Sequence, residues 1–173
     1  MTAMFGKLHR GFTLIELIIV MAIMAILTAM IAGNFQTSRI KALDARRKSD
    51  LKQIQTALET YLNDNAIYPP ESSGKIVACG SGASPCAWGE DAMENSKGTI
   101  YMAKVPGDVK QPTMQYLYVV SSDQRSYQLF ARLENDQDKD NVIFSGKQCG
   151  SDAASLCTYG VSSSNTTPSS SLP

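Results

Sequence analysis

Glu16 is the residue of this 173-residue chain whose position most demands a chemical explanation, because it is a carboxylate at the start of an apolar segment. From Leu17 to Gly33 no side chain is charged, and Thr28 carries the only polar side chain. An ionised group near the centre of a membrane costs roughly 2.5–3.5 kcal/mol on insertion scales, and such groups are generally paired. Glu16 is therefore expected to have a designated partner.

A second set of candidate ligands lies in the acidic run over residues 134–141, where Asp136, Asp138 and Asp140 stand at every second position. This spacing resembles the opening of an oxygen-ligand calcium loop, although the complete EF-hand motif is absent. Three clustered carboxylates repel one another, and a bound cation would relieve that repulsion. Two interpretations stay open: a structural calcium site that also uses Asn141, or a solvated acidic turn.

The N-terminus supplies the strongest motif. Lys7 and Arg10 precede the apolar run, a pattern typical of an export signal or a membrane anchor. The order Gly11-Phe12-Thr13-Leu14-Ile15-Glu16, followed by the apolar run, resembles the class III signal of type IV prepilins and type II secretion pseudopilins. The resemblance is specific, since an ordinary signal peptide has no use for Glu16.

This resemblance implies a processing step and an assembly step. A prepilin peptidase would cleave between Gly11 and Phe12 and methylate the new amine of Phe12. In the assembled filament, Glu16 would meet the Phe12 amine of a neighbouring subunit. The resemblance also bears on the acidic run, because major pseudopilins and some pilins hold calcium in this part of the head.

The same resemblance implies where the protein is located before and after assembly and which partners it meets. The precursor would cross the inner membrane once, with its head outside the cytoplasm, and would then enter an extracellular pilus or a periplasmic pseudopilus. The expected partners are membrane lipid before assembly, the prepilin peptidase, the inner-membrane assembly platform with its ATPase, and further copies of the chain. Among the functions that this resemblance implies, a structural subunit of a type IV pilus-like filament is favoured.

Two other functions remain as alternatives. The acidic run favours the major pseudopilin of a type II secretion system, which drives protein export, whereas cysteine pairs and a Ser-rich tail favour an exposed pilus. A single-pass membrane-anchored domain is the third alternative, and the position of Glu16 disfavours it.

The composition argues against an enzyme and against a nucleic-acid-binding protein. The single histidine, His9, lies in the predicted leader, so the mature chain would lack His-dependent triads and His-ligated metal centres. The 16 Lys and Arg residues balance the 16 Asp and Glu residues, and no basic patch stands out. No cofactor is expected apart from the candidate calcium ion.

All four cysteines follow the apolar segment, and an even number of cysteines in an exported domain favours disulfides. The pairs Cys79–Cys86 and Cys149–Cys157 are favoured, because each closes a short Gly/Ser-rich loop at a low entropic cost. The other two connectivities remain open. Zinc is disfavoured, since the chain contains no CxxC pair.

One long helix is predicted to carry Glu16 and to continue to about Asn65, since no proline interrupts it. In its second half, apolar residues recur at helical spacing opposite a charged face. Arg47 interrupts the apolar row, and a snorkelling side chain is the explanation that its residue type offers. Tyr68-Pro69-Pro70 follows the end of the helix.

Strand patterns predict an antiparallel hairpin over residues 115–120 and 126–133, with a third short strand over residues 142–144. The amphipathic half of the long helix would cover the apolar face of this sheet. The expected fold class is α+β: a long N-terminal helix packed on a small antiparallel sheet, as in pilins.

The predicted organisation has four parts. The leader spans residues 1–11, and a hydrophobic transmembrane and assembly helix spans residues 12–35. A globular head spans residues 36–161 and includes the amphipathic half of the helix. Residues 162–173, rich in Ser, Thr and Pro, are predicted to form a disordered tail.

Overall fold

The computed structural model describes residues 11–152 and 154–169. The predicted leader, apart from Gly11, and the last four residues of the predicted tail lie outside the described residues. The chain divides into two units at Arg39 and Ile40, shortly after the predicted boundary at residue 35. The two units are therefore treated one at a time.

The predicted long helix is α1, Leu14–Asn65. Ala66 follows it with a φ of 64°, in the left-handed region that commonly ends helices. Its amide donates to the carbonyl of Leu62 at 2.8 Å. Among the described residues, no single unbroken helix is both long enough and apolar enough to span a membrane. The two parts of α1 on either side of a short break, Leu14–Met30 and Phe35–Asn65, pass this test of length and composition only as a pair.

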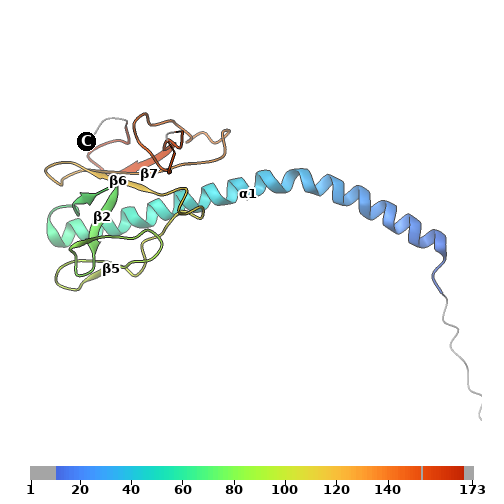
Figure 1. The fold of residues 1–173 in the computed structure, drawn as a ribbon, viewed down its shortest axis with the longest axis horizontal. Helices are drawn as coiled ribbons and strands as arrows, with labels where there is room; N and C mark the ends of the chain where they lie inside the picture. Colours follow the sequence, from blue (N-terminus) through green and yellow to red (C-terminus); the bar gives the residue numbers. More distant parts are fainter. Residues whose placement is uncertain (1–10, 153, 170–173) are drawn as a thin grey trace, which may run out of the picture. The chain divides into compact units, whose positions relative to one another are not determined.

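The described residues of the head, from Ile40 onward, form three small antiparallel sheets (Figure 1). The first joins β1 (Glu71–Ser72), β2 (Lys75–Cys79) and β3 (Ser84–Pro85), and the second joins β4 (Met93–Glu94) and β5 (Ile100–Met102). The third joins β6 (Leu117–Val120), β7 (Tyr127–Ala131) and β8 (Tyr159–Ser162) in that order.

The hairpin predicted from the sequence is confirmed by β6 and β7, which pair with Leu117 opposite Phe130 and Val120 opposite Tyr127. The predicted third strand over residues 142–144 is wrong, because β8 takes that place beside β7. Val142 and Ile143 are 56% and 65% exposed, so these apolar residues belong to a surface loop.

The predicted disordered tail is also corrected over residues 162–169. Ser162 ends β8, and Ser163 is 2% exposed. The buried amide of Gln128 donates to the carbonyl of Thr167 at 3.1 Å and to the hydroxyl of Ser169 at 3.2 Å. A buried amide needs hydrogen-bond partners, and this segment supplies them.

The core of the head lies between α1 and the sheets, and Figure 1 shows β2, β6 and β7 along the C-terminal part of α1. Leu51, Ile54 and Leu58 of the helix are fully buried against side chains that include Tyr118 and Leu129 of the third sheet. Burying an aliphatic side chain of this size stabilises the fold by about 1.5–3 kcal/mol. The fold class predicted from the sequence, α+β with a helix on a small antiparallel sheet, is confirmed.

Candidate processing and assembly site

The predicted cleavage point lies just before α1. Gly11, Phe12 and Thr13 have no regular secondary structure and are exposed, with Phe12 at 86% exposure. No atom from elsewhere in the described chain lies within 4 Å of the position that a Cβ on Gly11 would take. None of the described residues from outside this segment therefore covers the bond between Gly11 and Phe12.

Glu16 lies in the first turn of α1 and is bonded to Thr13. The Glu16 carboxylate accepts hydrogen bonds from the backbone amide of Thr13 at 2.9 Å and from its hydroxyl at 2.8 Å. The Thr13 hydroxyl in turn accepts from the Glu16 amide at 3.3 Å. These reciprocal bonds form a capping box, which satisfies amides that a helix start leaves without intrahelical partners.

The capping box was missed by the sequence reasoning, although Thr-x-x-Glu before an apolar run is its readable signal. It gives Glu16 a local partner within its own chain. The box also fixes the carboxylate at the helix start, where negative charge is favoured by the helix dipole. Glu16 is therefore oriented by Thr13 of its own chain.

The first part of α1 presents an apolar surface that no described residue covers. The large apolar side chains between Leu14 and Met30 are 48–76% exposed, and Phe35 is 61% exposed. Soluble monomers rarely expose contiguous apolar patches beyond a few hundred Å². Such a surface requires either lipid or other apolar helices around it.

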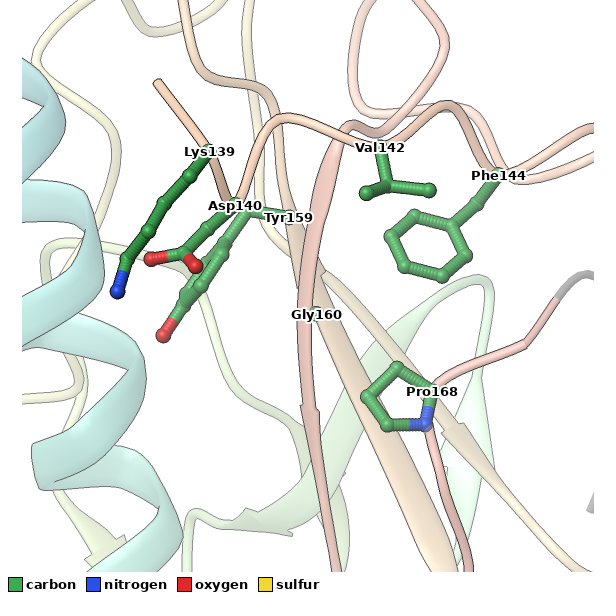
Figure 2. A pocket seen from close by; sticks show the side chains of 7 residues that line it. All are labelled: Lys139, Asp140, Val142, Phe144, Tyr159, Gly160 and Pro168. Carbon is green, nitrogen blue, oxygen red and sulfur yellow. The ribbon is translucent and has the colours of Figure 1, made fainter.

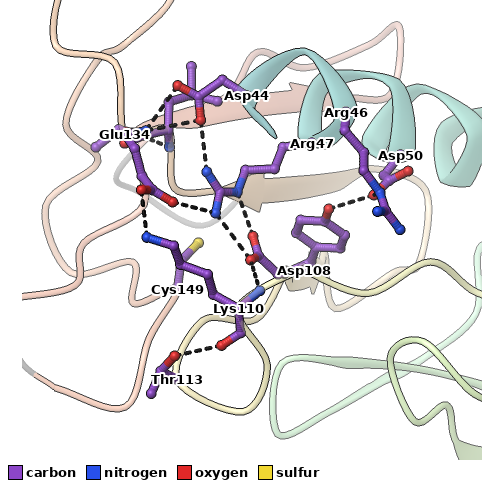
Figure 3. Close-up of polar contacts among 12 residues, drawn as sticks. Asp44, Arg46, Arg47, Asp50, Asp108, Lys110, Thr113, Glu134 and Cys149 are labelled. Carbon is purple, nitrogen blue, oxygen red and sulfur yellow. Dashed lines mark hydrogen bonds and ion pairs between the residues drawn. The ribbon is translucent and has the colours of Figure 1, made fainter. Parts of the chain in front are cut away.

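Arg47 is the polar residue of the head that the sequence explains least, because its side chain is only 1% exposed. Its Nε donates to Asp108 at 2.6 Å, its Nη1 to Asp44 at 2.8 Å and its Nη2 to Glu134 at 2.7 Å (Figure 3). The expected snorkelling of Arg47 is therefore wrong. The guanidinium is buried because three carboxylates share it.

The carboxylates around Arg47 also tie two loops to the helix. Asp44 accepts from the backbone amides of Glu134 and Asn135, and Asp108 accepts from the amide of Lys110. The Lys110 ammonium donates to the Glu134 carboxylate at 2.6 Å. With its polar atoms paired in this way, the cluster holds two loops, at Asp108–Lys110 and Glu134–Asn135, on α1.

The pKa shifts in this cluster follow from its contacts. Burial alone would lower the pKa of Arg47, but its bonds to Asp108, Glu134 and Asp44 outweigh burial and raise it. Burial alone would raise the pKa of Glu134, but Lys110 and Arg47 hold it below its usual value. The ionised forms of both groups are therefore stabilised by the fold.

Asp50 lies one helical turn beyond Arg46 and behaves differently. Burial raises the pKa of Asp50 above its usual value, and a hydrogen bond from the Tyr116 hydroxyl at 2.8 Å only partly offsets the effect. Arg46 approaches Asp50 at 3.9 Å from the surface. The hydrogen bond between Tyr116 and Asp50 links α1 to the residue that directly precedes β6.

Of the four predicted calcium ligands, the structure brings Asp138 and Asp140 together, around Lys48. The carboxylates of Asp138 and Asp140 both accept hydrogen bonds from the Lys48 ammonium. Asp136 is exposed, and the side chain of Asn141 donates to the carbonyl of Asn135 at 2.9 Å. Among the described residues, no group of three Asp, Glu, His or Cys side chains is arranged to hold a metal ion.

The structure pairs Cys79 with Cys86 and Cys149 with Cys157, the two local pairings that the sequence favours. The first closes the turn between β2 and β3, and the second lies in a small cluster with Phe130 of β7. Both disulfides therefore constrain the head.

Comparisons with known proteins agree with the N-terminal site. Residues 6–32 match the family model described as the prokaryotic N-terminal methylation motif. A protein from Pseudomonas aeruginosa named type II secretion system core protein G is 33% identical over 112 residues, which cover 63% of this chain and 73% of that protein. The chain is also similar to a protein of the same name from Vibrio cholerae, at 27% identity over 63% of this chain and 70% of that protein.

A further relative, from Klebsiella michiganensis and also named type II secretion system core protein G, is 37% identical over 66 residues. That alignment covers 38% of this chain and 46% of the relative, so the chain spans about half the length of this relative. No solved structure matches the chain significantly.

Proposed function

The chain belongs to the family of the type II secretion system core protein G, and from this membership we propose that it is the structural subunit of a secretion pseudopilus. It is a filament-forming protein and not an enzyme. Its precursor lies in the inner membrane with the head outside the cytoplasm, and the assembled filament is periplasmic and drives protein export.

The uncovered apolar surface of α1 is the observation that carries this proposal. Before assembly, membrane lipid covers this surface. In the filament, the same surface is buried against the helices of further copies of the chain. A prepilin peptidase acts at Gly11 and Phe12, and an inner-membrane platform with its ATPase adds subunits.

Glu16 supplies the electrostatic part of assembly. Cleavage after Gly11 creates a new amine on Phe12, and the Glu16 carboxylate of the incoming or neighbouring subunit neutralises it among apolar helices. Both charges would be costly there if unpaired, and breaking one side of a buried pair costs about 3–5 kcal/mol. The capping box orients the carboxylate for this contact.

Capping and pairing between subunits can be separated by two substitutions. Glu16→Ala removes both roles, whereas Thr13→Ala removes the capping hydroxyl and leaves the carboxylate. We expect Thr13→Ala to form filaments and Glu16→Ala to give processed protein that stays in the membrane. Normal filament yield from Glu16→Ala, or equal loss in both variants, would contradict the pairing role.

A subunit of a surface pilus is the second candidate. The two disulfides support it, because disulfides persist in the oxidising medium outside the cell and constrain the head there. The Ser-rich tail gives less support than the sequence alone suggested, because residues 162–169 pack on the head. Fractionation tests this alternative: filaments sheared from the cell surface favour a pilus, and filaments retained in the periplasm favour a pseudopilus.

A further inference from the structure

Lys48 places an ammonium group between two carboxylates of the acidic loop over residues 134–141. Its Nζ donates to both oxygens of Asp138, at 2.8 and 2.9 Å, and to Oδ2 of Asp140 at 2.8 Å. An ammonium group has three N–H donors, so it can donate hydrogen bonds to both carboxylates at once. Lys48 lies on α1, about ninety residues earlier in the chain, so the contacts fix the loop to the helix.

The surroundings of Lys48 favour the charged form. Partial burial lowers the pKa of Lys48, but hydrogen bonds and charge from Asp138 and Asp140 outweigh burial and raise it. The ammonium also lies 5.3 Å from the centre of the Tyr159 ring, within the range of a cation–π contact. Figure 2 shows the Asp140 carboxylate beside that ring, with Lys139 pointing the same way.

The loop completes its shape with internal hydrogen bonds. Oδ1 of Asp138 also accepts from the Asp140 amide at 3.0 Å, and the Asn141 amide donates to the Asp138 carbonyl at 3.0 Å. The hydrogen bond from Lys48 is the main cause that lowers the pKa of Asp138 below its usual value. The loop is therefore held in one conformation by a side-chain cation and its own backbone.

The same donors do not suit calcium. Calcium takes six to eight oxygen ligands at 2.3–2.6 Å. Here the oxygens of Asp138 and Asp140 face an ammonium, and the exposed Asp136 has no contact with that group in the described structure. A calcium ion at this point would have to displace Lys48 and bring a positive charge next to another.

We propose that the ammonium of Lys48, rather than a divalent cation, neutralises and orders the acidic loop, so that the head folds without calcium. The claim concerns the head alone and stands whether or not the chain forms filaments. It also means that Asp138 and Asp140, two of the three alternating aspartates that suggest a metal loop from the sequence, fix the loop to α1.

The test uses the full-length protein in detergent micelles, prepared without added metal. Trp88 is the only tryptophan and lies buried in the head, so its fluorescence reports thermal unfolding there. We expect the same Tm in EGTA and in millimolar calcium chloride, and no calcium bound to the protein by elemental analysis. A Tm that rises on adding calcium, or one calcium ion bound per chain, would overturn the proposal.

Substitutions test the role of Lys48 itself. Lys48→Gln should lower the Tm by several degrees and speed protease cleavage in the acidic loop, and Lys48→Arg should restore most of both. Lys139→Gln is the matched control, because it removes the same charge from an exposed position within the loop. If Lys48→Gln behaves like Lys139→Gln, the ammonium does not hold the loop and the proposal fails.

Discussion

Replacing Arg47 with Met would remove the guanidinium that joins α1 to two loops of the head while keeping a long side chain in its place. The variant leaves Asp44, Asp108 and Glu134 facing one another without their shared cation. Asp44 and Asp108 are almost fully buried, so water cannot take over the lost contacts without opening the head.

The expected cost follows from these contacts. Removing one partner from a buried ion pair costs about 3–5 kcal/mol, because an uncompensated charge stays in the interior. Arg47 serves three carboxylates, so we expect a loss of about 4 kcal/mol in the free energy of unfolding. For a domain of this size, that corresponds to a fall in Tm of roughly 10–20 °C.

Arg46→Met is the matched control, since it changes the adjacent residue in the same way. The Arg46 side chain is 61% exposed and lies 3.9 Å from Asp50, so its loss should cost less than about 1 kcal/mol. The assay is thermal unfolding of both variants in detergent, followed by Trp88 fluorescence. Equal Tm values for the two variants would refute the structural role of Arg47.

The pH dependence of the Arg47→Met variant offers a second check. In the wild type, Lys110 and Arg47 hold the pKa of Glu134 below its usual value, so loss of the guanidinium removes part of the stability that Glu134 contributes above pH ~4. As the pH falls through the pKa of Glu134, the wild type loses this contribution too, so the deficit of the variant relative to the wild type should shrink below pH ~4. A deficit that stays constant with pH would indicate lost packing alone.

Two further predictions concern the third sheet and Tyr116, which directly precedes it. Gly160→Ala would place a Cβ 2.8 Å from Cδ1 of Phe130, so we expect a loss of about 1–3 kcal/mol, measured as a lower urea midpoint; an unchanged midpoint would show that the sheet can move aside. Burial raises the pKa of Tyr116 and Tyr118 above the usual value, so their contribution to stability is present below pH ~10 and declines above it. As the pH is raised, the absorbance of ionised tyrosine should therefore increase over the same pH range in which the near-ultraviolet circular dichroism of the folded head is lost. Ionisation of the buried tyrosines while that signal persists would contradict this.

The predictions of secondary structure that the structure confirms rest on the spacing of apolar residues along the sequence. The uninterrupted helical pattern gave α1, and alternation of aromatic and aliphatic residues gave β6 and β7. β8 was missed because Tyr159–Ser162 contains a glycine and runs directly into a Ser-rich segment, where turn and tail signals dominate. Its order depends on pairing with β7, which no local pattern records.

The polar contacts of the head were beyond sequence reasoning for a related reason. Asp108 and Glu134 lie 61 and 87 residues from Arg47, so no spacing rule connects them. Only Asp44, three residues before Arg47 on the helix, gave a local hint. The acidic loop shows the same limit, since no spacing rule brings Lys48, about ninety residues earlier in the chain, beside Asp138 and Asp140.

The central claim is that the chain is processed after Gly11 and then polymerises through the exposed helix. Intact-mass spectrometry of purified filaments, without reduction, tests it most directly. The account predicts a chain that starts at Phe12, carries one added methyl group and lacks the hydrogens lost to two disulfides. Filaments built from chains that still begin before Gly11 would contradict it.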